Sequence, residues 1–124
     1  MKYLGVDFGL RRIGLATSDG ELASPFKVVE GRGFTDLVEK IKKEAVGFDK
    51  IVVGLPEGKI GQTVLGFVKA LKKSGLDVET ADETLSSQKA VEAMVELNIS
   101  KKDRRVIDAV AAAIILQNYL DLKK

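Results

Sequence analysis

The sequence of 124 residues predicts an α/β protein built on one mixed five-stranded sheet. The first 30 residues contain only strand-like segments, whereas helical and strand-like segments alternate from residue 34 onward. Apolar residues make up 45% and charged residues 31% of the chain, which is the balance of a folded globular protein. We therefore expect an antiparallel three-strand meander continued by two parallel strands, with helices on both faces of the sheet.

The first three predicted strands follow one another through short turns. Residues 3–6 are apolar throughout, and apolar residues alternate with smaller ones over residues 13–17. An Asp19-Gly20 turn then leads to a third strand-like segment over residues 22–29. Consecutive strands joined in this way pair antiparallel, which gives the meander.

The rest of the chain alternates between helices and strands. Helical spacing of apolar residues begins at Phe34, and Thr35-Asp36 is a suitable helix start. Gly75 is expected to end the second helix. The expected elements are a helix over residues 34–45, a strand over 50–54, a helix with an apolar stripe over 64–71, a strand over 77–81, and helices over 85–97 and 103–120.

The composition excludes several kinds of chemistry. Cysteine and histidine are absent, so there are no disulfides, thiol nucleophiles, Cys/His zinc sites or imidazole bases. Any catalysis must use carboxylates, lysines, hydroxyls or a bound hard cation. Met1-Lys2 leads straight into a strand, and the longest apolar run, Ala109–Leu116, is far shorter than the ~18 residues of a membrane span. We expect one cytoplasmic domain over residues 1–124.

Three carboxylates occupy positions that suggest a shared site. Asp7 ends the first apolar strand, and Glu83 follows the fifth strand directly. Asp108 lies in a helical stretch, residues 106–120, in which twelve of the fifteen residues are apolar, so we expect it to be largely buried and to need a partner. The carboxyl ends of parallel strands meet at one edge of a sheet, where the last helix can bring Asp108 to the other two.

Local structure offers a simpler account of two of these acids. Asp7 can serve a turn in which Gly9 takes a positive φ. Glu83 can be a first-turn helix acid beside a cap at Thr84 or Ser86. Neither account applies to Asp108.

A carboxylate cluster of this kind indicates a metal site for phosphodiester hydrolysis. Oxygen ligands suit Mg²⁺ or Mn²⁺, and two such ions ~4 Å apart can activate water and stabilise the leaving oxygen. Basic residues flank two of the acids and are expected to contact the phosphates of a nucleic acid. These are Arg11, Arg12, Lys101, Lys102, Arg104 and Arg105. The pairs Lys42-Lys43 and Lys72-Lys73 are expected to be solvated surface charges.

Four stretches, taken together and in order, resemble the YqgF/RuvX family, a branch of the ribonuclease H-like superfamily akin to the RuvC resolvases. They are "LGVDFGLRRIGLATSD", "IVVGLP", "DETLSS" and "IDAVAAAIILQNYL", and they cover the chain almost end to end. The resemblance implies a ribonuclease H-like nuclease domain whose acidic site falls on Asp7, Glu83 and Asp108. It also implies a metal-dependent nuclease that matures the small-subunit ribosomal RNA precursor or cleaves branched DNA.

Two positions depart from the family's pattern. Thr84 stands where relatives have an arginine, and Ser86 stands where they have a threonine. The loop "GLPEGKIGQT" also lacks the usual small polar run before its glycine.

Other functions remain as alternatives. A non-catalytic nucleic-acid-binding module could keep the same fold, although it would gain nothing from acids that face phosphates. Actin-like ATPases and sugar kinases share the first motif, but they clamp a nucleotide between two domains and 124 residues supply one. Because no apolar helix face is left unpaired, we expect a monomer or weak homodimer, which favours a ribosomal RNA precursor over a symmetric DNA junction.

Overall fold

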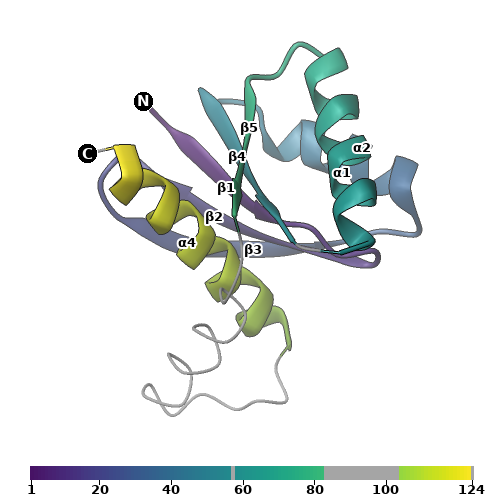
Figure 1. The fold of residues 1–124 in the computed structure, drawn as a ribbon, viewed down its shortest axis with the longest axis horizontal. Coiled ribbons are helices and arrows are strands. Elements are labelled where there is room, and N and C mark those ends of the chain that lie inside the picture. Colours follow the sequence, from purple (N-terminus) through teal and green to yellow (C-terminus); the bar gives the residue numbers. More distant parts are fainter. Residues whose placement is uncertain (57, 83–103, 124) are drawn as a thin grey trace.

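The structure is a computed structural model that describes residues 1–56, 58–82 and 104–123 (Figure 1). Its elements in chain order are β1 (Tyr3–Asp7), β2 (Arg12–Ser18), β3 (Ala23–Glu30), α1 (Phe34–Glu44), β4 (Lys50–Leu55), α2 (Ile60–Lys73), β5 (Val78–Asp82) and α4 (Arg104–Lys123). Each agrees with a predicted element, with ends shifted by a few residues. The helix predicted over residues 85–97 lies outside the described residues.

The five strands form one mixed sheet in the order β3-β2-β1-β4-β5. β1 pairs antiparallel with β2 and β2 with β3, whereas β1 pairs parallel with β4 and β4 with β5. Figure 1 shows α1 and α2 on one side of the sheet and α4 on the other. The predicted fold class is therefore confirmed, and the carboxyl ends of β1, β4 and β5 share one edge.

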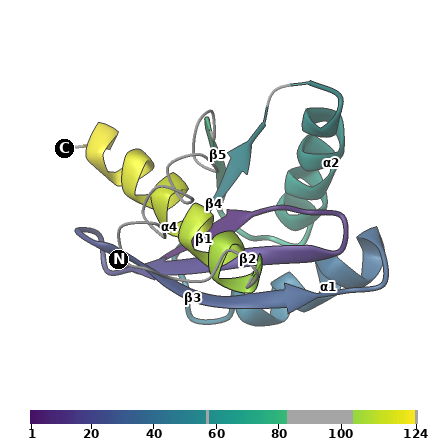
Figure 2. The same cartoon turned by 90° about the horizontal axis from the view of Figure 1, so that it is seen from below.

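Each face of the sheet has its own apolar core, because strand side chains alternate between the two faces. Leu4 and Val6 of β1 are fully buried in the core that α1 and α2 cover. On the opposite face, Ala16 of β2 and Val52 of β4 pack in a second core with Leu116 of α4. Figure 2 shows α4 crossing the sheet over β1 and β2.

Glycines allow α4 to lie very close to the sheet. A Cβ at Gly5 would lie 2.8 Å from the Cβ of Leu116 and 3.0 Å from the carbonyl oxygen of Ala112. A Cβ at Gly14 would lie 2.0 Å from the carbonyl oxygen of Asp108. No side chain fits at either distance, so both strand positions require glycine.

The opposite end of α4 is held by a side-chain amide. The Oε1 of Gln117 accepts the N–H of Ala23 at 2.8 Å, and its Nε2 donates to the carbonyl of Glu21 at 3.0 Å.

Of the helices in the described part of the chain, none combines the length and hydropathy needed to cross a membrane.

Two local expectations are corrected. Gly9 does not have a positive φ; a Cβ there would lie 2.5 Å from the carbonyl oxygen of Arg12, so close backbone approach is what requires glycine. Helix α1 begins at Phe34 after Gly33, rather than at a Thr35-Asp36 cap. The Asp36 carboxylate instead accepts the backbone N–H of Arg32 at 2.9 Å.

Candidate active site

Asp7 ends β1 at the edge where the parallel strands finish. It is half-buried, and the alternation of the strand places it on the same face as Gly5, which is the face that α4 covers. β4 ends at Leu55, whose partner in the sheet is Asp82, the last residue of β5. A second carboxylate therefore terminates a parallel strand at this edge.

Asp108 reaches this part of the sheet from α4. Its carbonyl oxygen lies over Gly14, and Gly14 is the residue of β2 that pairs with Asp7. Gly14 thus lies between the backbone of Asp7 and the backbone of Asp108. The structure brings together two residues that are far apart in the sequence.

Asp108 is accompanied by an arginine from β2. The Arg12 Nε lies 3.6 Å from its Oδ2, and the side chains are 33% and 26% exposed. The Asp108 side chain is thus mostly buried and has a partner, as the apolar helix around it led us to expect. A partly exposed pair of this kind contributes at most about 1 kcal/mol, so its main effect is to orient the carboxylate.

The other predicted site residues are only partly described. Glu83, Lys101 and Lys102 lie outside the described residues. Arg104 and Arg105 are the first two residues of α4, and Arg11 is exposed in the loop between β1 and β2. Within residues 1–56, 58–82 and 104–123, no three Asp, Glu, His or Cys side chains form a metal-binding group.

Two charged residues near this edge were missed by the sequence analysis. Asp82 precedes Glu83 and ends β5, a position that its pairing with Leu55 establishes. Arg32 lines a groove of about 710 Å³ together with Arg11 and Arg12. Its position between two glycines, in "GRG", is the only sequence signal that could have drawn attention to it.

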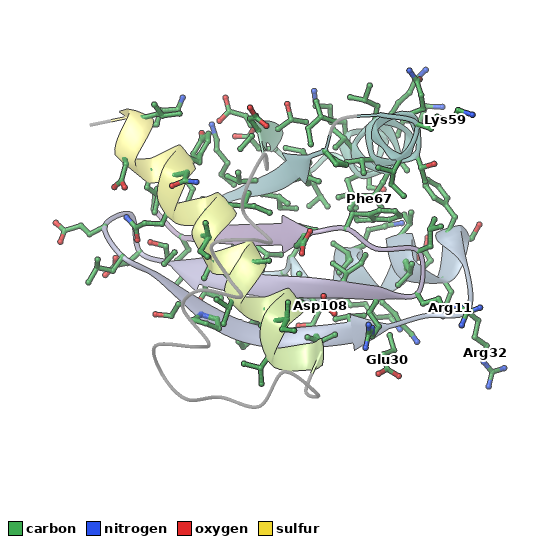
Figure 3. All side chains as sticks on the ribbon, turned by 60° about the horizontal axis from the view of Figure 1, so that its bottom comes forward. Arg11, Glu30, Arg32, Lys59, Phe67 and Asp108 are labelled. Carbon is green, nitrogen blue, oxygen red and sulfur yellow. The ribbon has the colours of Figure 1, made fainter. Side chains whose placement is uncertain are left out.

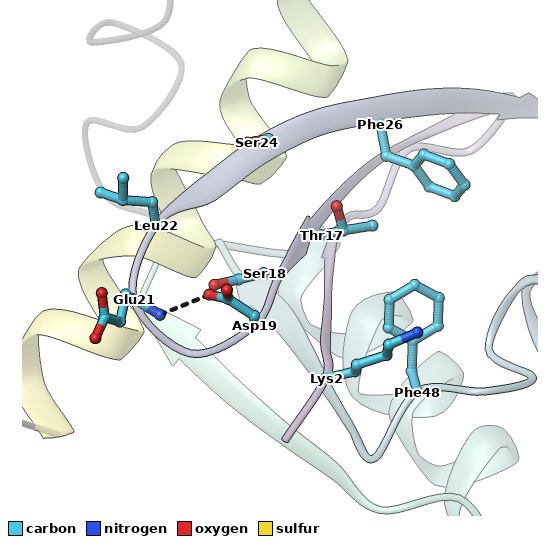
Figure 4. A pocket seen from close by; sticks show the side chains of 9 residues that line it. All are labelled: Lys2, Thr17, Ser18, Asp19, Glu21, Leu22, Ser24, Phe26 and Phe48. Atoms are coloured by element: carbon cyan, nitrogen blue, oxygen red, sulfur yellow. Dashed lines mark hydrogen bonds between the residues drawn. The ribbon is translucent and has the colours of Figure 1, made fainter.

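A further pocket lies at the opposite end of the sheet, beside the turn between β2 and β3 (Figure 4). It has a volume of about 600 Å³, and its lining includes Thr17, Phe26 and Phe48. The Glu21 N–H donates to the Asp19 Oδ1 in that turn at 3.3 Å. Because Tyr3 at the start of β1 pairs with Ser18, this pocket is remote from Asp7.

The strand order, with an acid ending the central strand and a second acid on the helix that crosses it, defines a protein of the ribonuclease H-like fold. Two solved resolvases share this fold. RuvC of Thermus thermophilus in complex with a Holliday junction gives a TM-score of 0.60 at 17% identity, over 99% of this chain and 95% of that one. The fowlpox virus resolvase with Holliday junction DNA gives 0.66 at 11% identity, over 99% of each.

The chain belongs to the RuvX family. The model of that family, described as Holliday junction resolvase, matches residues 1–122. A relative from Natranaerobius thermophilus is 36% identical over 133 residues, covering 98% of this chain and 94% of its own. One from Clostridioides difficile is 37% identical over 134 residues, covering 98% and 95%. Both are named pre-16S rRNA nuclease, and the resemblance seen in the sequence is confirmed.

A likeness to a sugar kinase also exists and is limited in extent. The ROK hexokinase of Thermus thermophilus gives a TM-score of 0.50 at 20% identity, over 77% of this chain but 38% of the kinase. The chain thus matches less than half of that enzyme. This likeness shows shared fold elements and gives no support to the nucleotide-clamping alternative.

Proposed function

We propose that this chain is a metal-dependent nuclease that hydrolyses phosphodiester bonds in the precursor of 16S ribosomal RNA. The observation that carries the proposal is the meeting of Asp7 and Asp108 at Gly14, with the Arg12 guanidinium beside Asp108. Family membership and the names of the curated relatives support it. Such a protein acts in the cytoplasm as one nuclease domain.

The donor set fits a hard divalent cation. Asp7 and Asp108 offer carboxylate oxygens on one face of the sheet, and Glu83 follows Asp82 at the same edge in the sequence. Asp7, Glu83 and Asp108 would hold Mg²⁺ or Mn²⁺, with two ions as the proposed number. When bound, the ions supply an activated water and neutralise charge that develops on the phosphate.

The chain's own cations would position the substrate. Arg12 is held beside Asp108 and half-exposed, so its remaining donors can contact a phosphate next to the carboxylates. Arg11, Lys101, Lys102, Arg104 and Arg105 would bind the flanking strand as further phosphate contacts.

Branched DNA is the alternative substrate, and two findings favour it. The family description is Holliday junction resolvase, and the structurally similar resolvases were solved with such junctions. Symmetric cutting of a four-way junction needs two active sites related by a two-fold axis, whereas trimming one RNA end needs one. We propose a monomer or weak homodimer, which is consistent with RNA. A non-catalytic binding module is a further alternative.

One experiment separates the three possibilities. Purified protein is incubated with a 16S precursor fragment and with a synthetic four-way junction, each with Mg²⁺ or Mn²⁺, while light scattering at micromolar concentration gives the oligomeric state. We expect a monomer or weak dimer that cleaves the RNA and requires the metal. A stable dimer that nicks the junction at paired symmetric positions and spares the RNA would establish the DNA alternative. Binding without cleavage of either substrate would establish the module.

A further inference from the structure

A groove of about 710 Å³ adjoins the candidate active site. Arginines supply much of its lining, which consists of Leu10, Arg11, Arg12, Glu30, Gly31, Arg32 and Gly33. Arg12 belongs to this lining and also contacts Asp108, so the groove and the site are continuous. In Figure 3, Arg11 and Arg32 lie together at one end of the molecule, with Glu30 between Arg32 and Asp108 in that view.

Backbone hydrogen bonds fix the two loops that carry these arginines. Arg12 pairs with Glu30 in the sheet, and one step further the Gly31 N–H donates to the carbonyl of Arg11 at 3.1 Å. The Arg32 N–H donates to the Asp36 carboxylate of α1 at 2.9 Å. The loop before α1 is therefore tied both to the Arg11 loop and to α1.

Glycine keeps this loop close to the protein surface. A Cβ at Gly31 would lie 2.6 Å from the Cδ2 of Leu37, so a side chain there would have to displace this fully buried leucine of α1. Gly33 has a φ of +151°, and a Cβ added there would meet no atom within 4 Å. Arg32 lies between these two glycines, and its long side chain is exposed.

The arginines of the groove differ in whether they form an ion pair with a described residue. Arg12 is paired with Asp108, and Lys40 contacts both the Asp36 carboxylate, at 3.2 Å, and the Glu30 carbonyl, at 2.7 Å. Arg11 and Arg32 are exposed, and neither forms an ion pair with any residue that the structure describes. Two guanidinium groups thus project from fixed loops with donors available to a ligand.

We propose that Arg11 and Arg32 together bind a backbone phosphate of the nucleic-acid strand that enters the active site. The planar guanidinium matches two phosphate oxygens at once, which a lysine does not. The strand would run from Asp108, past Arg12 and Glu30, to the loop that precedes α1. This inference rests on the proposed nuclease function and assigns Arg32, which the sequence analysis passed over, to substrate binding.

The test measures binding separately from cleavage. Fluorescence anisotropy of a labelled single-stranded RNA is recorded in EDTA at several salt concentrations for wild type, Arg32→Ala, Arg32→Lys and Lys43→Ala. Lys43 is an exposed cation of α1, so its alanine variant is a matched loss of one charge away from the groove. The Arg32→Ala variant should fold normally, because the side chain is exposed and the backbone N–H that Asp36 accepts is retained.

We expect Arg32→Ala to weaken binding about three- to tenfold and to lower the slope of log K against log salt by about 0.7. Arg32→Lys should give an intermediate loss, and Lys43→Ala should stay within about twofold of wild type. Replacing single phosphates of the RNA with neutral methylphosphonates should identify one position whose loss weakens wild type but leaves Arg32→Ala unaffected.

The outcomes for the groove and for the nuclease are distinguishable. Equal affinities for Arg32→Ala and Lys43→Ala, or a wild type that does not bind single-stranded RNA, would overturn the phosphate contact. Cleavage by wild type would then still support the nuclease. A specific loss in Arg32→Ala with a wild type that cleaves no substrate would retain the groove and remove the nuclease.

Discussion

The Nε of Arg12 lies 3.6 Å from the Oδ2 of Asp108 and joins β2 to the first turns of α4. The contact is possible because Gly14, two residues further along β2, leaves no Cβ in the path of the helix backbone. The same glycine pairs with Asp7. The position of α4 and the positions of the two carboxylates are therefore set by the same part of the sheet.

Asp7→Asn should abolish cleavage while leaving the fold intact. An amide keeps the shape of the carboxylate but removes the charge that a metal ligand needs. Melting temperature and Mn²⁺-dependent cleavage are measured together. Asp77→Asn is the control, because Asp77 precedes β5 at the other end of the parallel strands and is 60% exposed on its side chain. Full activity in Asp7→Asn would refute the assignment of this acid.

Divalent metal should stabilise the wild-type fold. Binding to the native state alone adds about 1–3 kcal/mol when the ion is well above its dissociation constant. The effect should disappear when Asp7, Glu83 and Asp108 are all changed to their amides, since the ligands are gone and their mutual repulsion with them. Thermal melting with and without millimolar Mg²⁺ or Mn²⁺ checks this. An identical metal response in both proteins would place the ions elsewhere.

Gly14→Ala should destabilise the protein and reduce its activity. The new Cβ would lie 2.0 Å from the carbonyl oxygen of Asp108, so α4 must move. We expect a loss of about 3 kcal/mol in the free energy of unfolding. Gly66→Ala is the matched control, because Gly66 is an exposed α2 residue and an added Cβ would lie 3.9 Å from the Cζ of Phe34, an ordinary contact distance. That change should stabilise the protein by about 0.5–1 kcal/mol. Denaturant unfolding compares the two, and a neutral Gly14→Ala would contradict the close packing of α4.

Replacing four arginines with serine should weaken nucleic-acid binding. For a single strand, the slope of log K against log salt should also fall by up to about 3. The four are Arg11, Arg12, Arg104 and Arg105. Serine substitution of four lysines on α1 and α2 should change binding little. These are Lys42, Lys43, Lys72 and Lys73. Titrations at several salt concentrations compare the sets, and equal losses would mean that the binding face has been misplaced.

The stability that Asp36 gives to the loop before α1 should depend on pH. The backbone hydrogen bond from Arg32, and then Lys40, lower the pKa of Asp36 below its ordinary value of 3.8. A lowered pKa in the folded state means that the contribution is fully present above pH 3.8 and is lost as pH falls through the folded value. Asp36→Asn should therefore melt below wild type at pH 7, with the difference shrinking towards pH 2. A difference independent of pH would show that the charge of Asp36 is not responsible.

Much of the fold could be predicted because its signals are local. The alternation over residues 13–17, the Asp19-Gly20 turn and the end of α2 at Gly75 each depend on neighbours in the sequence, and the positive φ of Gly20 and Gly75 agrees with those two predicted roles. The pairing of the parallel strands followed from chain connectivity alone.

The errors concern contacts between distant segments. Counting apolar residues over 106–120 predicted that Asp108 needs a partner but could not show that this partner is Arg12 of β2. Nothing near Gly9 in the sequence shows that the carbonyl of Arg12 approaches it. Arg32 could not be singled out because the groove that it lines is formed by two separate segments of the chain.

The docking of α4 on Gly5 and Gly14 also sets when the protein can act during its synthesis. Asp7 leaves the ribosome roughly a hundred residues before Asp108. At about 5–20 residues per second, that interval is roughly 5–20 s. A nascent chain that has already formed its first strands holds only part of the proposed active site. On the proposed assignment of Asp108, we expect no cleavage of RNA until the helix carrying this residue has emerged and packed on the two glycines.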